Sequence, residues 1–424
     1  MTSSTSNFDI PPRLNSQDFQ LDPYPVLRWL RHENPVYIDP ESGVYWITRY
    51  QDVVDCFNKP QIFSSRIMHD SHSVVFGPSL TAMDGEEHTM KRNIVAPEFV
   101  GKRLEAFLPV IEQNAHDLIE KFTENAASNL IKNFSSNREV DLVDAFTARL
   151  PVAVIVEMLD LPRTDLPFFE ECYSTLIRGL APLPQLREAG IQINLRFHDY
   201  LDPIVRERYS APKEDLISKL CMAEVDGERL EIEEIKAFTS LLLVAGGETT
   251  DKAIANLWWL LLNHPDQFDA VQKNYDLIDH AFTEMMRHSD PVGGEPREVH
   301  QSLEMHNVII PEGAIVHLSM RSGNHDEVIF SDPDEFNIFR NDLYFGKEMR
   351  VGFHDGNQAS HLGFGLGKHF CVGYQMARAE AVIGTRLLLE TLKNIRIKSG
   401  KNPVMGTAEI MRSIPKLEVE YDRR

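Results

Sequence analysis

Apolar residues recur at helical spacing over most of this chain, and the longest such stretch covers residues 232–263. The same pattern predicts further helices over residues 26–33, 50–57, 104–122, 141–161, 166–180, 187–209, 277–288 and 374–392. Strands are predicted at 36–38, at 44–47 and between 291 and 323. Residues 64–80 lack a period and mix Ser, His, Gly and Pro, so we expect a long loop there.

The helix predicted over 232–263 contains an unusual run in its middle, Ala245-Gly-Gly-Glu-Thr-Thr250. Two mid-helix glycines cost about 1 kcal/mol each relative to alanine. Glu248 stands between apolar stretches, where a carboxylate is costly unless it is paired or used. The run therefore indicates a local distortion around a ligand. The structural alternative is an N-capping Thr and a salt-bridged Glu.

Charge and composition narrow the class of protein. The 424 residues are 42% apolar and 25% charged, as in a soluble globular protein with a sizeable core. The net charge of −21, from 43 basic and 64 acidic residues, argues against binding to nucleic acid or to an anionic membrane surface. There is no signal-peptide core, no run of 18 apolar residues and no pairing spacing among four cysteines. We expect a soluble cytoplasmic protein without a membrane anchor, and a flexible N-terminal segment over residues 1–20.

The most specific chemistry lies in a glycine-rich run from His361 to Gly373, His-Leu-Gly-Phe-Gly-Leu-Gly-Lys-His-Phe-Cys-Val-Gly. Its glycines permit positive φ and a close approach of the backbone to a flat ligand. Cys371 is delivered to the start of a predicted helix, where free N–H groups and the helix dipole favour thiolate over thiol. A thiolate that also receives N–H bonds suits an axial iron ligand. The remaining cysteines read as core thiols: Cys56, Cys172 and Cys221.

The run Phe364-Gly365-x-Gly367-x-His369-x-Cys371-x-Gly373 resembles the haem-ligand loop of the cytochrome P-450 family, with every fixed position filled in order. The resemblance covers nearly the whole chain from Asp22 onward. It implies a mainly α fold, with a large helical part and a small β-rich part in a single catalytic domain over residues 21–424. It also implies haem b (iron protoporphyrin IX) with an axial thiolate from Cys371, the metal ligand. The implied haem contacts from this run are Phe364, Gly365, His369, Cys371 and Gly373. The alternative is a buried structural cysteine in a glycine-rich turn.

The resemblance also assigns basic residues to the haem propionates. His88 and Arg92 are four residues apart, so they share a helix face, and they match the family pattern HxxxR. Arg297 stands at the family's later propionate-binding Arg. Arg and His give charge-assisted hydrogen bonds to an anion. Without the cysteine loop, His88 and Arg92 would read as a solvated charged face.

A further triplet resembles the buried ion network behind the haem in the family. Glu284 and Arg287 form an ExxR pair, and Arg340 ends the family's second arginine motif. An isolated ExxR is common and is usually a surface pair worth under about 1 kcal/mol. The role implied for these residues is structural support of the cysteine loop.

Ala245, Gly246, Glu248 and Thr249 match the family motif Ala/Gly-Gly-x-Asp/Glu-Thr. By resemblance, Ala245 and Gly246 contact the cofactor, and Gly246 and Gly247 make room for dioxygen. Thr249 and Glu248 are then the catalytic pair: Thr249 hydrogen-bonds the activated oxygen and Glu248 relays protons to it. Peroxide-using relatives often lack this pair, so a peroxide-driven peroxygenase is the runner-up.

Two features depart from the family. His325 stands where Arg is usual, with an effect that the sequence leaves open. Residues 341–360 are longer than in many soluble relatives and precede the haem loop. Three basic residues there could steer an acidic ferredoxin, although a solvated loop is an equal alternative: Lys347, Arg350 and Lys368.

The implied reaction is hydroxylation or epoxidation of a mostly apolar small molecule by dioxygen. Electrons would come from a separate ferredoxin and ferredoxin reductase, and the protein would act as a monomer. An apolar pocket is suggested by Leu242, Leu243, Ala245, Val292 and Met411, which fits a terpenoid, polyketide, steroid or fatty chain. We expect a role in secondary metabolism. The alternatives from other classes are a non-catalytic haem-thiolate sensor and a helical scaffold without haem.

Overall fold

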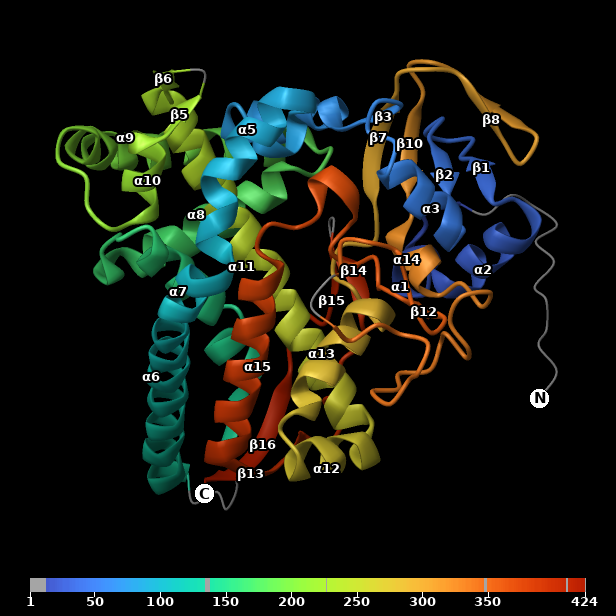
Figure 1. The fold of residues 1–424 in the computed structure, drawn as a ribbon. Helices are drawn as coiled ribbons and strands as arrows, with labels where there is room; N and C mark the ends of the chain where they lie inside the picture. The colour runs from blue at the N-terminus through green and yellow to red at the C-terminus, as the bar shows by residue number, and fades with distance from the viewer. Residues whose placement is uncertain (1–12, 134–137, 226, 347–348, 409–410, 424) are drawn as a thin grey trace. The chain divides into compact units, whose positions relative to one another are not determined.

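The computed structural model describes residues 13–133, 138–225, 227–346, 349–408 and 411–423 (Figure 1). The chain forms two compact units, and each is assembled from segments that are far apart in the sequence. Unit 1 comprises Met1–Met68, Thr283–Cys371 and Val404–Ser413. Unit 2 comprises His69–Phe282, Val372–Pro403 and Ile414–Arg424. Within the described part of the chain, no helix has both the length and the apolar content needed to cross a bilayer.

Unit 2 is mainly helical. Its α-helices are α4 (His72–Phe76), α5 (Gly85–Val95), α6 (Gly101–Asn133), α7 (Leu150–Met158), α8 (Leu166–Gly179), α9 (Pro184–Ser210), α10 (Leu216–Met222), α11 (Ile232–Asn263), α12 (Pro265–Lys273) and α15 (Tyr374–Thr391). Shorter turns are η2 (Leu80–Ala82), η3 (Ala96–Phe99), the π-helical η4 (Val143–Thr147) and η5 (Arg163–Asp165). Its strands are β4 (Arg138–Asp141), β5 (Glu224–Val225), β6 (Glu228–Arg229), β13 (Leu392–Ile397) and β16 (Glu418–Arg423). The order β13-β16-β4 makes an antiparallel sheet, and β5 pairs with β6.

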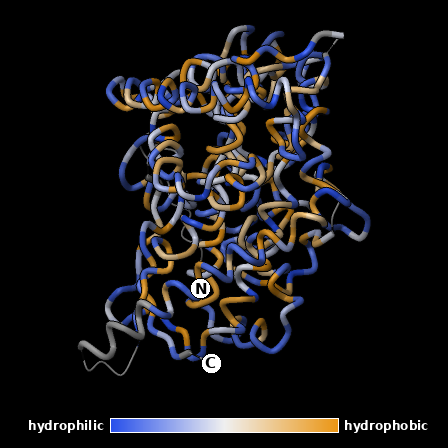
Figure 2. The backbone as a smooth tube through the Cα atoms, turned by 90° about the vertical axis from the view of Figure 1, so that its left-hand side faces the viewer, coloured by the Kyte–Doolittle hydropathy of each residue, from blue (hydrophilic) through white to orange (hydrophobic). Residues whose placement is uncertain are grey.

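Helix α11 is the central element of unit 2. It begins with a capping box between Glu231 and Glu234 and ends before Pro265, which starts α12. Most of its residues are buried because α7, α8, α9 and α15 pack against it. Helices α6 and α15 also run side by side (Figure 1). Figure 2 shows hydrophobic and hydrophilic residues alternating along the helical coils, as expected for amphipathic helices around a core.

Unit 1 contains the larger sheet, of order β1-β2-β10-β7-β3. Its strands are β1 (Val36–Ile38), β2 (Tyr45–Ile47), β3 (Phe63–Ser64), β7 (Glu295–Val299) and β10 (Ile315–Leu318), with separate hairpins β8–β9 (Leu303–Met305, Val308–Ile310), β11–β12 (Phe353–His354, Gln358–Ala359) and β14–β15 (Gly406–Ala408, Met411–Ser413). Its helices and turns are α1 (Gln17–Leu21), α2 (Tyr24–Glu33), α3 (Tyr50–Phe57), α14 (Met320–Asn324) and η6 (Gly367–His369). Helix α13 (Leu277–His288) contributes its last turns to unit 1, and η1 (Ser65–Asp70) spans the boundary at Met68. Only β2 and β10 pair in parallel within this sheet among the described strands.

Several predicted elements need correction. Residues 64–80 are not one long loop, because η1 and the short helix α4 form there. Val75 and Phe76 of α4 are buried, so packing rather than periodicity stabilises this turn. Residues 141–161 are not one helix either. The chain passes from β4 through the π-helical η4 to α7, whose first turn contains Pro151, a residue that cannot continue a preceding helix.

Two predicted irregular segments also contain regular structure. Residues 1–12 of the expected flexible segment lie outside the described residues, and its end forms α1, capped by Ser16. The stretch 341–360, expected as a loop, folds back on itself in the β11–β12 hairpin. The prediction of a mainly α fold with a small β-rich part is confirmed.

Candidate functional site

The Cys371 loop, residues 361–371, is shaped by hydrogen bonds within its own backbone. The N–H of Gly365 donates to the Leu362 carbonyl at 2.7 Å, and the N–H of Cys371 donates to the Phe364 carbonyl at 2.9 Å. The second bond places Cys371 opposite Phe364, two residues before Gly373, the N-cap of α15. The loop therefore fixes the backbone that carries the cysteine, as the glycine spacing predicts.

Two glycines of this loop adopt a conformation that other residues disfavour. Gly365 has φ +65° and Gly367 has φ +67°. A Cβ built on Gly367 would lie 2.6 Å from the carbonyl oxygen of Phe57. Likewise, a Cβ on Gly363 would lie 2.8 Å from the carbonyl oxygen of Met286 in α13. Glycine is thus required here both by φ and by the close approach of neighbouring backbone.

The four cysteines differ in their surroundings. Cys371 is half-buried, whereas the others are buried in their units, as predicted for core thiols. Burial raises the pKa of the Cys172 thiol to about 12 and that of Cys221 to about 11, with smaller contributions from nearby charges. Burial, followed by Asp52, also raises the pKa of Cys56. Those thiols stay protonated, which suits packing and not metal ligation.

A buried ion network lies behind the loop in unit 1. Arg287 holds Glu284 through two hydrogen bonds, Nε to Oε2 at 2.7 Å and a terminal nitrogen to Oε1 at 2.8 Å, and neither residue is exposed. Arg340 approaches the same Oε1 at 3.5 Å, and the N–H of Asn337 donates to it at 2.9 Å. Both guanidinium groups also lie over the ring of Phe330. The three residues predicted as a network are therefore brought together.

The network reaches the Cys371 loop through a residue that sequence reasoning missed. Arg287 donates to the carbonyl of Asn324 at 2.8 Å. The side-chain oxygen of Asn324 accepts the N–H of Leu362 at 2.7 Å. Asn324 thus connects the ExxR pair to the first turn of the loop, a contact that no sequence spacing signals.

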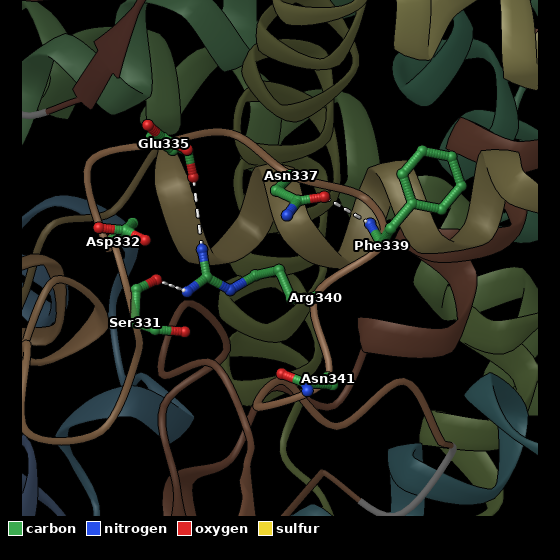
Figure 3. A pocket seen from close by; sticks show the side chains of 7 residues that line it. All are labelled: Ser331, Asp332, Glu335, Asn337, Phe339, Arg340 and Asn341. Atoms are coloured by element: carbon green, nitrogen blue, oxygen red, sulfur yellow. Dashed lines mark hydrogen bonds between the residues drawn. The ribbon is translucent and has the colours of Figure 1, made fainter.

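A small polar cavity opens beside Arg340 (Figure 3). It has a volume of about 240 Å³ and is lined by Ser331, Asp332, Glu335, Asn337, Phe339, Arg340 and Asn341. Figure 3 shows the guanidinium pointing to the backbone of Ser331 and Glu335, to whose carbonyls it donates. It also donates to Asp342 at 2.8 Å. The Arg340 guanidinium already donates to these three acceptors within the protein, which fits a supporting role better than ligand binding.

His325 fills the position of the family's usual Arg as a neutral ring. Its Nδ1 donates to the Arg321 carbonyl at 3.1 Å, and the ring packs on Tyr24 with centroids 4.3 Å apart. Burial, followed by the charges of Arg287 and His288, holds the pKa of His325 well below its usual range. The substitution therefore removes one positive charge from a region that already contains Arg287.

Arg297, the predicted propionate ligand of unit 1, lies on β7 and is 5% exposed. Its guanidinium donates to the Pro296 carbonyl at 2.7 Å, pairs with Glu295 at 3.6 Å and lies over the ring of Phe57. Val292 is half-buried in the same unit, and Met411 is buried on β15. Glu295 stands two residues before Arg297 on the same face of β7, so this pairing could have been expected from the sequence once the strand was placed.

Four more of the predicted residues belong to unit 2: His88, Arg92, Leu242 and Leu243. His88 is buried and Arg92 is half-buried on α5, one turn apart as predicted. Leu242 and Leu243 are buried on α11, 7% and 0% exposed. Their contact with a substrate stays a prediction. Of the predicted basic patch, Arg350 and Lys368 are exposed on unit 1, and Lys347 lies outside the described residues.

The run 245–250 is continuous helix in α11. The Thr249 hydroxyl donates to the carbonyl of Ala245 at 2.7 Å, one turn earlier. A Cβ on Gly246 would meet Ile155 of α7 at 3.7 Å, and one on Gly247 would meet Val152 at 3.4 Å. The expected local distortion is therefore absent from this described run, and the glycine Cα atoms face α7.

Glu248 is salt-bridged, as the structural alternative for this run expected, and its partner belongs to a charged cluster that sequence reasoning did not name. Lys252 lies 3.3 Å from Glu248 and 2.8 Å from Asp251, and Asp251 accepts the Thr147 hydroxyl at 2.7 Å. We call these four residues the Lys252 cluster. The spacing of Glu248 and Lys252, four residues apart on one helix, was a visible signal. Thr147 lies on η4 and no spacing could reveal it.

Comparison with known proteins agrees with these features. The family model described as cytochrome P-450 matches residues 175–421. Pulcherriminic acid synthase of Bacillus subtilis (strain 168) is 32% identical over 90% of this chain and 91% of its own. The solved structure of CYP109Q5 from Chondromyces apiculatus has a TM-score of 0.82 and 27% identity, and the match covers 96% of this chain and 97% of that one.

The chain belongs to the cytochrome P-450 family. Another relative, cyclomarin C epoxidase CymV of Salinispora arenicola (strain CNS-205), is 30% identical over 88% of this chain and 89% of its own. The predicted family, the cytochrome P-450 fold and the monooxygenase activity are confirmed. As a cytochrome P-450, the protein uses haem with a cysteine thiolate ligand, together with dioxygen and redox partners.

The Cys371 loop fits this cofactor class. It presents a half-buried cysteine on a backbone with two positive-φ glycines and with close approaches that leave no room for larger residues at Gly363 and Gly367. The other described cysteines are buried thiols. In unit 2, a Cβ on Gly373, the N-cap of α15, would meet no described atom within 4 Å.

Proposed function

We propose that Cys371 would hold haem b through its thiolate in this cytochrome P-450 monooxygenase. The observation that carries the proposal is the geometry of the Cys371 loop, with its Cys371–Phe364 hydrogen bond and its two left-handed glycines. Phe364, Gly365, His369 and Gly373 would then contact the cofactor. When bound, haem supplies the iron at which dioxygen is reduced and one oxygen atom is transferred to the substrate.

The basic residues and the buried network have separate tasks in this proposal. His88, Arg92 and Arg297 would neutralise the haem propionates, because cations give strong hydrogen bonds to carboxylates. Arg297 already has a carboxylate neighbour in Glu295, so a propionate would compete for that pair. Glu284, Arg287 and Arg340 would hold the loop, and the path from Arg287 through Asn324 to Leu362 supports this role.

Thr249 and Glu248 would handle protons. The Thr249 hydroxyl is held by the Ala245 carbonyl, so its oxygen lone pairs are left to accept a further hydrogen bond near the haem. Glu248 would take a proton from water on one carboxylate oxygen and release it toward the site, returning to the carboxylate. Ala245, which is exposed, and Gly246 would line the cofactor side of α11.

The substrate would be a mostly apolar small molecule of secondary metabolism. Two relatives are named as pulcherriminic acid synthase and cyclomarin C epoxidase, which supports this class. Leu242, Leu243, Val292 and Met411 supply apolar side chains for its pocket. We propose a ferredoxin and a ferredoxin reductase as electron donors to a monomeric, cytoplasmic enzyme.

The carbon monoxide difference spectrum of the dithionite-reduced protein tests the ligand. We expect a strongly red-shifted Soret band for the natural protein and for Cys221→Ala, a matched control at a buried core thiol. Cys371→Ser should lose that band, because a hydroxyl is not a thiolate. A red-shifted band that survives Cys371→Ser would reject the assignment. An unshifted band in the natural protein would reject the thiolate-based mechanism.

A further inference from the structure

The Lys252 cluster joins the proposed proton relay to the core of unit 2. The ammonium of Lys252 lies 3.3 Å from Oε1 of Glu248, one turn earlier on α11. It also lies 2.8 Å from Oδ2 of Asp251. The side chains of Lys252 and Glu248 are 18% and 16% exposed, so water screens this pair less than a surface pair.

Asp251 anchors the lysine to a second element. Its side chain is 1% exposed, and its Oδ1 accepts the hydroxyl of Thr147 from η4 at 2.7 Å. Because the hydrogen bond from Thr147 holds the Asp251 carboxylate in place, Asp251 sets the position of the Lys252 ammonium. Glu248 is then held by an ammonium whose own position is set from outside α11.

The two carboxylates beside Lys252 favour its charged form. Burial alone would lower the pKa of Lys252, but Asp251 and Glu248 outweigh that effect, and the pKa is raised. The lysine is therefore a permanent cation at working pH. A Glu followed four residues later by Lys is the more favourable order on a helix.

Other titratable groups around the cluster come from neighbouring elements. Tyr173 and Glu170 lie on α8, and Arg149 precedes α7. Arg149 pairs with Glu170 at 3.2 Å and with Asp144 at 3.4 Å. Burial, followed by Asp251 and Glu248, raises the pKa of Tyr173, so its phenol stays neutral at working pH.

We propose that Lys252 is a positioning residue for oxygen activation: it holds the Glu248 carboxylate in one place for proton relay. Asp251 and Thr147 set the position of Lys252. This inference rests on the proposed function of Glu248. It goes further because it adds three groups that hold Glu248 in position: the Lys252 ammonium, the buried Asp251 carboxylate and the Thr147 hydroxyl on η4.

The test is the pH dependence of NADH oxidation by the holoprotein with dioxygen, a surrogate ferredoxin and its reductase, in water and in heavy water. Lys252→Met removes the cation and keeps the length of the side chain. We expect the acid-side midpoint of the profile to move up by about one pH unit, because a carboxylate that loses a neighbouring cation binds its proton more tightly. We also expect the rate at neutral pH to fall at least about threefold and the solvent isotope effect to change.

Three further variants make the result decisive. Lys252→Arg should restore the natural midpoint, since it keeps the charge. Lys273→Met, which removes an exposed lysine paired one turn away with Asp269, should change nothing. Glu248→Gln should abolish the acid-side titration and lower the rate.

The possible outcomes separate the inference from the function beneath it. A natural midpoint and isotope effect in Lys252→Met, together with altered values in Glu248→Gln, would overturn the positioning role alone. Natural values in Glu248→Gln would overturn the relay and with it this inference. Should Lys252→Met fail to give the red-shifted carbon monoxide band, Thr147→Val replaces it. That variant removes the hydroxyl on Asp251, so it should move the midpoint in the same direction by a smaller amount, and an unmoved midpoint would overturn the inference.

Discussion

In the Cys371 loop, Gly365 and Gly367 have φ near +66° and Gly367 touches the backbone of Phe57, whereas Gly246 and Gly247 of α11 keep helical geometry. A methyl group on either glycine of α11 would meet only side-chain atoms at ordinary contact distances. The loop glycines are therefore imposed by backbone geometry. The α11 glycines allow close packing of helices, and the groups proposed to act there are side chains.

The ion pairs of the two regions differ in the same way. Glu284 and Arg287 are completely buried, and Arg287 also donates to the backbone carbonyls of Pro333 and Glu335. Glu248 and Lys252 retain some exposure, as a proton relay needs. We infer that changes in the first region damage the folded holoprotein, and that changes in the second region alter turnover while the fold persists.

Arg287→Lys should have the largest effect. Lysine cannot reproduce the two parallel bonds to Glu284 or the bonds to the carbonyls of Pro333 and Glu335. Leaving a buried carboxylate poorly paired costs about 3–5 kcal/mol. Urea unfolding and haem content per chain measure the loss. Arg206→Lys, at an exposed pair with Asp202, is the control, and its unfolding midpoint and haem content should match those of the natural protein. Equal losses in both variants would remove the distinction drawn between the regions.

Gly367→Ala should have the next largest effect, and Gly400→Ala is its matched control. Both residues have positive φ, +67° and +72°, which costs a non-glycine residue about 1–2 kcal/mol. A Cβ on Gly400 would meet nothing within 4 Å among the described residues, whereas one on Gly367 would clash with the Phe57 carbonyl. Gly367→Ala should therefore lose roughly 1–3 kcal/mol more. Thermal unfolding followed at the Soret band measures the difference, and similar values would show that the close approach relaxes easily.

The contrast between these regions also explains what the sequence could predict. Helices α11 and α13 were predicted at 232–263 and 277–288, the bounds that they have, because long apolar periods end there at residues that stop a helix, such as Pro265. The grouping of Glu284, Arg287 and Arg340 followed from motifs read by resemblance. Both predictions rest on patterns that can be recognised in the sequence itself, either in consecutive residues or in motifs with fixed spacing.

Contacts that depend on tertiary packing were not predictable in this way. Asn324 reaches Leu362 across 38 residues, and Thr147 reaches Asp251 across 104 residues. Helix α4 forms where no period exists, because Val75 and Phe76 are buried against neighbouring helices. Half of the Lys252 cluster was nonetheless visible, since Glu248 and Lys252 stand one helical turn apart.

Thr249→Ala should have the smallest effect on stability and a clear effect on turnover. Among the described residues its hydroxyl donates to the preceding turn of its own helix, and such a bond adds little to helix stability. Thr239→Ala is the matched control, because Thr239 lies nearly three turns earlier on α11 and makes the same kind of bond, to the Ile235 carbonyl. Both variants should keep the red-shifted carbon monoxide band. With a compound that gives a type-I spectral shift, Thr249→Ala should form at least about threefold more hydrogen peroxide per NADH than the natural protein, because oxygen is released before transfer. Thr239→Ala should not. Unchanged coupling in Thr249→Ala would remove the assignment of Thr249, and a lost band would place Thr249 with the framework residues of the Cys371 loop.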